Sequence, residues 1–99
     1  MLIQNYRDLE AWQLGMEFVT RVYILTATFP REEVYGLSAQ LRRAAVGIPS
    51  NISEGHQHPT KSFLHFVTIA IGSLAECQTQ LEVAGRLQLA AESGMCRRC

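Results

Sequence analysis

The sequence has no excess of either charge, since nine lysines and arginines balance nine aspartates and glutamates in 99 residues. Proteins dedicated to nucleic acid usually carry net positive charge or a clear basic face, so this balance weighs against that class. The sequence also lacks an apolar run near the roughly 20 residues that a membrane span requires. Its first residues, MLIQNYRDLEAW, do not have the organisation of a secretory signal, so we expect a cytoplasmic protein with no membrane partner.

Cysteine is scarce, and the three cysteines present do not form the pattern of a disulfide framework, so we expect reduced thiols. Ligand types of a tetrahedral zinc site do occur in two pairs, His56 with His58 and Cys96 with Cys99. These pairs lie at opposite ends of a predicted helix about 45 Å long, so we expect no intrachain metal site. A redox role for the C-R-R-C end would need a βαβ setting, and an incidental tail is favoured.

Catalytic patterns are also missing. We find no phosphate-binding glycine loop, no carboxylate pair of the glycosidase type and no Ser-His-Asp arrangement. We therefore predict no catalytic residues, no cofactor and no small-molecule substrate, and a protein that is not an enzyme.

The sequence does contain strong helical periodicity, and this periodicity runs through a proline. Apolar residues keep three- and four-residue spacing on both sides of Pro49, at Leu37, Leu41, Ala44, Ala45, Ile48 and Ile52. The pattern predicts one kinked helix over residues 38–55 rather than two helices. Ser38 is the predicted N-cap, and Gly47 would leave room for the bend.

Two further helices are predicted, over residues 8–28 with Asp8 as N-cap and over residues 60–91. The core stripe of the last helix is Phe63, Phe66, Val67, Ala70, Leu74, Cys77, Leu81 and Ala84. Short connections make neighbouring helices antiparallel, so the fold class is an all-α up-and-down bundle. Residues 1–99 form one domain, with 92–99 as a tail.

The first predicted helix is apolar on two opposite faces. One face carries Leu9, Trp12, Met16, Val19 and Tyr23, and the other carries Ala11, Leu14, Phe18, Val22 and Leu25. A domain of this size can cover only one such face well, so the sequence predicts a homo-oligomer. Its expected subunit interface is Leu14, Phe18, Val22 and Leu25. The alternative is that this face packs under the loop at residues 29–35.

Polar side chains share one strip of the second helix, namely Arg43, Ser50, Asn51 and Glu54, and Arg43 is level with Glu76 of the last helix. We favour a structural role, in which Arg43, Asn51 and Glu54 satisfy the backbone carbonyl freed by Pro49 and tie the helices together. The alternative is a ligand or nucleic-acid site.

Two adjacent arginines are the candidate phosphate contacts. Arg42 and Arg43 could bind RNA or DNA, especially if symmetry repeats them around a ring. The alternative, favoured by the overall charge balance, is a pair of solvated or ion-paired arginines.

Three sequence blocks carry a family resemblance: YRDLEAWQ at residues 6–13, YGLSAQLRRAAVGIPSNISEG at 35–55 and IAIGSLAECQTQLEVA at 69–84. Together they resemble the bacterial four helix bundle proteins, also called the 23S rRNA intervening-sequence protein family. The resemblance implies a small cytosolic helical bundle that assembles as a homopentamer, most members having no known role. A relative is the accessory protein of diversity-generating retroelements, a pentamer that binds nucleic acid and reverse transcriptase.

The sequence departs from the family after Leu89, where it reads AAESGMCRRC and relatives carry a further amphipathic helix. We therefore expect a C-terminally shortened member with three long helices and a fourth that is missing or vestigial. Either the last helix packs against a neighbour or a groove stays partly open. The predicted function is a non-enzymatic, homo-oligomeric binding or scaffold subunit. The alternative is an accessory protein that binds RNA or DNA.

Overall fold

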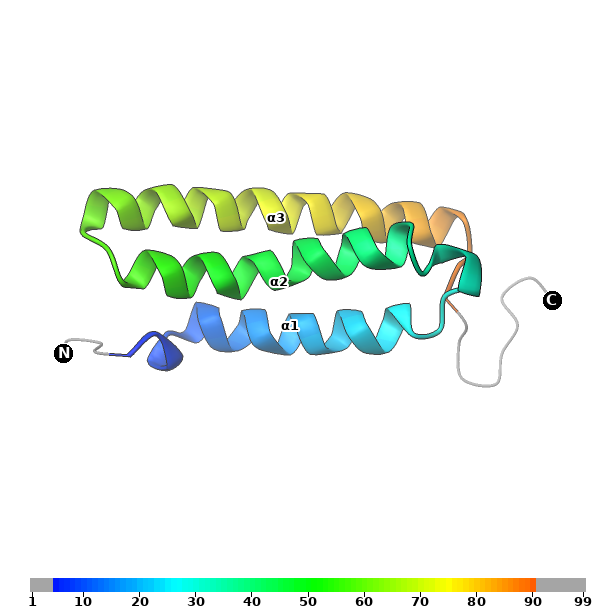
Figure 1. The fold of residues 1–99 in the computed structure, drawn as a ribbon, viewed down its shortest axis with the longest axis horizontal. Helices are drawn as coiled ribbons and strands as arrows, with labels where there is room; N and C mark the ends of the chain where they lie inside the picture. Colours follow the sequence, from blue (N-terminus) through cyan, green and yellow to red (C-terminus); the bar gives the residue numbers. More distant parts are fainter. Residues whose placement is uncertain (1–4, 91–99) are drawn as a thin grey trace.

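The computed structural model describes residues 5–90, and all regular structure in this part of the chain is helical (Figure 1). The three α-helices are α1 (Glu10–Thr26), α2 (Leu37–His56) and α3 (Thr60–Arg86). Short 3₁₀ helices, η1 (Tyr6–Asp8) and η2 (Arg31–Glu33), precede α1 and α2. Since α1 and α3 run in one direction and α2 in the other, the predicted all-α bundle is confirmed.

Helix α2 continues through its proline, as the periodicity predicted. Pro49 is buried inside the helix, and Leu41 and Ala45 on the same helix are fully buried. Two glycines of α2 lie where α3 packs closely against it. A Cβ added to Gly47 would lie 3.1 Å from the Ser73 hydroxyl, and Gly55 lies within α2 against Phe66.

The helix starts differ from the predictions. Asp8 lies in η1 rather than capping α1, which begins after Leu9 without a side-chain cap. Ser38 is buried one residue inside α2, so it is not the N-cap either. The carboxylate of Glu33 instead accepts the Leu37 backbone N–H at 3.1 Å, which satisfies one of the free donors at the start of α2.

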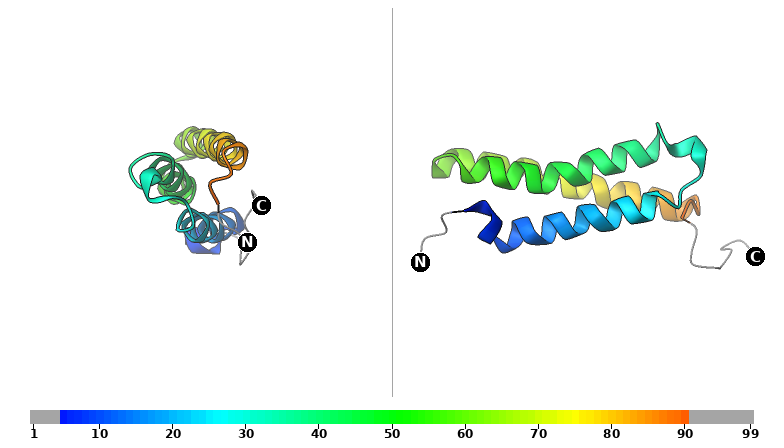
Figure 2. Two further views of the ribbon diagram at one scale, coloured as in Figure 1. Left: turned by 90° about the vertical axis from the view of Figure 1, so that its right-hand side faces the viewer. Right: turned by 60° about the horizontal axis from the view of Figure 1, so that its bottom comes forward.

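Helix α3 ends at Arg86, five residues before the predicted end at residue 91. The cause is a Schellman-type turn, in which the Leu89 N–H bonds to the Ala84 carbonyl at 3.1 Å and the Gln88 N–H to Gly85 at 3.1 Å. Gln88 takes the left-handed conformation with φ of 55°. The chain then leaves α3 toward α1 (Figure 2), and the tail predicted at residues 92–99 lies outside the described residues.

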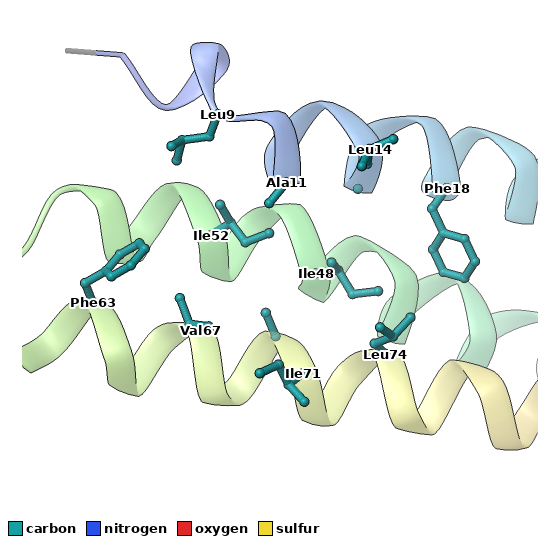
Figure 3. Close-up of a pocket in the computed structure, with 12 residues that line it drawn as sticks. Leu9, Ala11, Leu14, Phe18, Ile48, Ile52, Phe63, Val67, Ile71 and Leu74 are labelled. Carbon is teal, nitrogen blue, oxygen red and sulfur yellow. The ribbon is translucent and has the colours of Figure 1, made fainter. Parts of the chain in front are cut away.

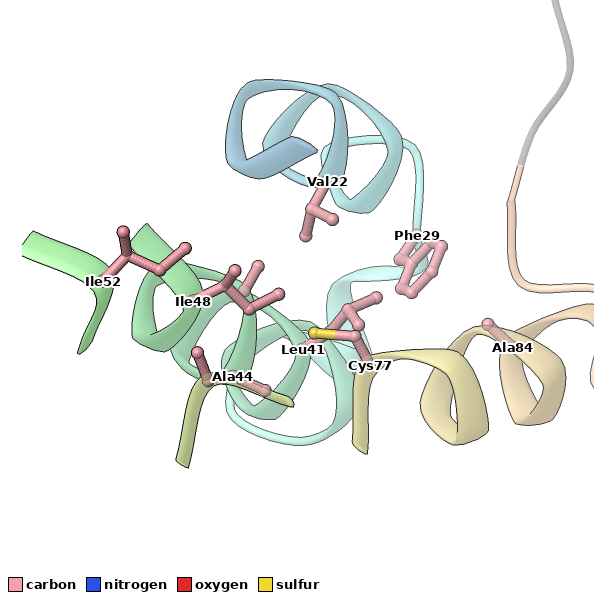
Figure 4. Close-up of a cluster of buried hydrophobic side chains, with 10 residues drawn as sticks. Val22, Phe29, Leu41, Ala44, Ile48, Ile52, Cys77 and Ala84 are labelled. Atoms are coloured by element: carbon pink, nitrogen blue, oxygen red, sulfur yellow. The ribbon is translucent and has the colours of Figure 1, made fainter. Parts of the chain in front are cut away.

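The core is centred on α2 (Figure 4). Its buried members are Val22, Phe29, Leu41, Ala44, Ala45, Ile48, Ile52, Ala70, Cys77 and Ala84. α2 contributes half of them because, in the described part of the chain, it contacts both other helices, whereas α1 and α3 do not contact each other. Viewed along the bundle, α1 and α3 diverge from α2 (Figure 2, left). Within residues 5–90, one side of the bundle therefore has no helix.

Candidate interaction surface

An apolar groove lies between α1 and α3, with a volume of about 450 Å³ (Figure 3). We call it the α1–α3 groove. Leu14 and Phe18 line the α1 side, and Ile48 and Ile52 of α2 form the floor. The α3 side includes Phe63, Val67, Ala70, Ile71 and Leu74, and Leu9, Ala11 and Gly15 of the N-terminal region complete the lining.

The groove has the chemistry of a packing surface. Each of its lining residues is apolar or glycine, so its lining side chains provide no nucleophile, no acid or base and no ligand for a metal. Ile71 is 62% exposed and Leu14 is 58% exposed, which is unusual for large aliphatic side chains that face each other. A surface of this kind binds other apolar surface.

The predicted interface residues divide into three groups. Leu14 is exposed in the groove, and Phe18 lines it while half-buried. Leu25 is half-buried, packed against the core cluster. Val22, in contrast, is only 2% exposed because its own chain covers it, so including Val22 in a surface was wrong.

The cause of this error is the position of the α1–α2 contact. The buried residues of α1 are Gly15, Val22 and Thr26. Val22 is at the edge of its predicted apolar face, and Gly15 and Thr26 lie between the two apolar faces that the sequence indicated. A Cβ on Gly15 would lie 3.4 Å from the Pro49 ring, in van der Waals contact, so α2 packs against α1 at this point. The two predicted apolar faces of α1 consequently lie on either side of its contact with α2.

A partly open groove was one of the two alternatives expected after Leu89, but no residues of the last helix were named for it. Leu74 had been assigned to the core stripe, but it is 39% exposed. The signal was present in the sequence as Val67, Ile71 and Leu74, which are spaced by four and then three residues.

The opposite flank of α1 is partly covered. A smaller depression of about 210 Å³ lies there, lined in part by Tyr6, Trp12, Met16 and Val46. The rings of Tyr6 and Trp12 meet edge to face with centroids 5.3 Å apart. This aromatic pair packs η1 onto α1 and leaves less apolar surface free than on the groove side.

Arg42 lies in the seam between α1 and α2. Its Nε donates to the Thr26 hydroxyl at 2.7 Å, and its guanidinium carbon lies 4.4 Å from the centre of the Tyr23 ring. Arg43 is exposed and makes no ion pair within residues 5–90. The two candidate phosphate contacts thus have different environments. The guanidinium of Arg42 contacts residues of α1, whereas that of Arg43 is exposed and unpaired with an acidic side chain of the described residues.

Asn51 does bond to the backbone near the proline, but not to the predicted carbonyl. Its Nδ2 donates to the Gly47 carbonyl at 2.7 Å, whereas the group freed by Pro49 is the Ala45 carbonyl. Ser50 is exposed, and its carbonyl accepts from the Ser53 hydroxyl at 3.0 Å. These contacts stay within one turn of α2 and do not join two helices.

The other members of the predicted polar cluster are separated. No ion pair joins Arg43 to Glu76 in the part of the chain that the structure describes. Glu76 accepts instead from Nε2 of the buried Gln80 at 3.2 Å. Glu54 lies 4.0 Å from Nε2 of His58, one turn along. The structure therefore shows local pairs and not one polar site.

The thiol of Cys77 is fully buried and free. Burial raises its pKa, and the negative charge of nearby Glu76 adds to the rise. Between residues 5 and 90, no three His, Cys, Asp or Glu side chains are grouped so that they could hold a metal ion. Cys96 and Cys99 lie outside this range.

No described helix is both long enough and apolar enough to cross a membrane.

Comparison with known proteins agrees with the sequence blocks. The model of one family, described as 23S rRNA-intervening sequence protein, matches residues 7–95. This match confirms the resemblance and covers the three helices and the groove between α1 and α3. No curated protein matches the chain.

Proposed function

Because the chain belongs to the 23S rRNA-intervening sequence protein family, we propose that it is a non-catalytic, cytoplasmic subunit of a homo-oligomer, acting in binding or as a scaffold. Five copies are the proposed stoichiometry, from the resemblance described above. The proposal assigns the protein no cofactor and no small-molecule substrate.

The observation that carries the proposal is the uncovered apolar surface of the α1–α3 groove. Large aliphatic side chains, with Leu14 and Ile71 each more than half exposed, face water on the side where the described residues place no helix. Covering apolar surface stabilises an assembly by about 25 cal/mol for each Å² removed from water. Association of subunits would supply that cover.

Light scattering on the full chain tests the proposal. We expect a mass of about five times the 11.1 kDa of one chain at micromolar concentration, and a smaller mass on dilution if subunits exchange. A mass of one chain at every concentration would contradict homo-oligomerisation. A stable mass other than five chains would contradict only the stoichiometry.

A second candidate function is RNA or DNA binding, favoured by the exposed Arg43 and by its repetition in a symmetric assembly. Binding to RNA should weaken steeply as salt rises, and Arg43→Ala should reduce both the affinity and the salt slope. Arg21→Ala is the matched control, because Arg21 is an exposed arginine already paired with Glu17 at 3.3 Å. No binding at low salt would reject this candidate.

A further inference from the structure

Three groups of α1 hold the guanidinium of Arg42. Its Nε donates to the Thr26 hydroxyl at 2.7 Å, its Nη2 donates to the Tyr23 carbonyl at 3.4 Å, and its carbon lies 4.4 Å from the centre of the Tyr23 ring. The Thr26 hydroxyl itself donates to the Val22 carbonyl at 2.8 Å, so its oxygen is left to accept from Arg42. One edge and one face of the guanidinium are therefore occupied by α1.

Helix α1 is the element that needs this cation. Its last turn contains no basic residue, although the carbonyls at the C-terminus of a helix favour a positive charge nearby. Tyr23 and Thr26 both lie in that last turn. Arg42 of α2 therefore supplies the charge, from a position 16 residues beyond Thr26 in the chain.

The groups that hold Arg42 are all neutral. They are a hydroxyl, a backbone carbonyl and an aromatic ring, and within residues 5–90 Arg42 makes no ion pair with an acidic side chain. A phosphate group is ionised and forms shorter and stronger hydrogen bonds with arginine than a neutral acceptor does. Phosphate is therefore a group that would compete with α1 for Arg42.

Arg43 indicates where such a phosphate would lie. It follows Arg42 directly on α2, and it is exposed, whereas Arg42 is half-buried. Because the two residues are adjacent and arginine side chains are long, a released Arg42 would lie within reach of a nucleic-acid backbone bound at Arg43. The contacts with α1 thus separate two neighbouring cations that would otherwise serve one ligand.

We propose that α1 masks Arg42, an autoinhibitory contact that keeps this arginine from RNA until the end of α1 releases it. The inference rests on the second candidate function, RNA binding, and adds its regulation. A partner that loosens the end of α1 would raise the affinity for RNA. By linkage, RNA bound through both arginines would loosen the end of α1.

Variants of α1 test the mask by fluorescence anisotropy with a labelled single-stranded oligouridylate. Thr26→Val removes the acceptor of Arg42 Nε, and Tyr23→Leu removes the ring. We expect each variant to bind more tightly than the parent, with a slope of log affinity against log salt that is steeper by about 0.7, as for one more phosphate neutralised. Thr20→Val is the matched control, since Thr20 is exposed on the same helix and bonds only to the Met16 carbonyl, and it should bind like the parent.

Two further variants assign the gain to the arginine. Arg42→Gln alone should bind RNA like the parent, because the masked charge contributes nothing there, and combining it with Thr26→Val should remove the gain. Gly55→Ala controls for a general loss of stability, since a Cβ at Gly55 would lie 2.9 Å from Cβ of Phe66 on α3, and it should also bind like the parent. Circular dichroism confirms that each variant is folded.

The possible failures are distinguishable. Equal affinity and slope in the parent, Thr26→Val and Tyr23→Leu, with binding that Arg43→Ala weakens, would overturn the mask and leave the second candidate function standing. A gain that persists when Arg42→Gln is added to Thr26→Val would come from another group, which also overturns the mask. If neither the parent nor these variants bind RNA at low salt, the second candidate function and the inference fail together.

Discussion

Arg42 on α2 donates a 2.7 Å hydrogen bond to the hydroxyl of Thr26 on α1. The same hydroxyl donates to the Val22 carbonyl at 2.8 Å, so this buried group both donates and accepts a hydrogen bond. The Arg42 guanidinium also lies over the Tyr23 ring. This charge-assisted contact joins α1 to α2 near the end of α1.

Replacing Thr26 with valine should therefore destabilise the fold although the shape of the side chain is kept. Thr26→Val removes the acceptor of Arg42 Nε, and we expect the free energy of unfolding to fall by about 1–2 kcal/mol. Urea denaturation at one protein concentration measures this. Thr20→Val is the control, because Thr20 is exposed and bonds only to the Met16 carbonyl of its own helix. Equal effects at both positions would show that the interhelical bond contributes nothing.

Alanine at two glycines should act in opposite directions. A Cβ at Gly55 would lie 2.9 Å from Cβ of Phe66, so Gly55→Ala should reduce the free energy of unfolding by about 1–3 kcal/mol through overpacking. Gly85 has open space around its Cβ position, and Gly85→Ala should stabilise the end of α3 by about 0.5–1 kcal/mol. Thermal unfolding of both variants tests the α2–α3 contact. A neutral Gly55→Ala would mean that the helices can separate there without loss.

The turn that ends α3 is held by a residue in an unfavourable conformation. Gln88 has φ of 55°, a region that glycine adopts without strain, so Gln88→Gly should raise the free energy of unfolding by about 0.5–1 kcal/mol. Gln78→Gly, in the exposed middle of α3, should lower it by about 1 kcal/mol. Chemical denaturation of the two variants should therefore show changes of opposite sign in the free energy of unfolding. A loss of stability in Gln88→Gly would be evidence against the left-handed turn.

Cys77 should make stability depend on alkaline pH. Its folded-state pKa is raised by burial, so its contribution is fully present below the ordinary thiol pKa and is lost as pH rises toward the folded-state pKa. The parent should therefore lose more stability than Cys77→Ala when the pH increases from about 7 to about 10.

Denaturation curves at several pH values provide the comparison. Cys96 and Cys99 are present in both proteins, and their titration cancels in the difference. If the free energy of unfolding falls equally with pH in the parent and in Cys77→Ala, this would contradict a buried, protonated thiol.

Local pattern was sufficient to predict α2. Its apolar spacing continues on both sides of Pro49, and the structure confirms one uninterrupted helix with Leu41 and Ala45 fully buried. Such spacing is informative because it depends only on the helical repeat. Helix ends were harder, since the α2 start uses the carboxylate of Glu33 and the α3 end uses a left-handed Gln88. Neither residue type is the usual choice at its position.

The candidate site was predicted only in part for a related reason. Leu14 and Phe18 were identified from the excess of apolar residues around α1, but Val22 was assigned to the wrong side and Ile71 was missed. Helical periodicity shows that two faces are apolar and does not show which angle between them a neighbouring helix will occupy. That angle is shown by the burial of Gly15 beside Pro49, two residues 34 positions apart in the chain.

The amino-acid order by itself determined that this chain is helical, that α2 passes through its proline and that the chain belongs to its family, because each of these depends on local spacing or local motifs. Tertiary structure alone decided which apolar residues remain in water. The reason is that α1 and α3 both pack on α2 and not on each other, so exposure of Leu14 and Ile71 is a property of three helices together.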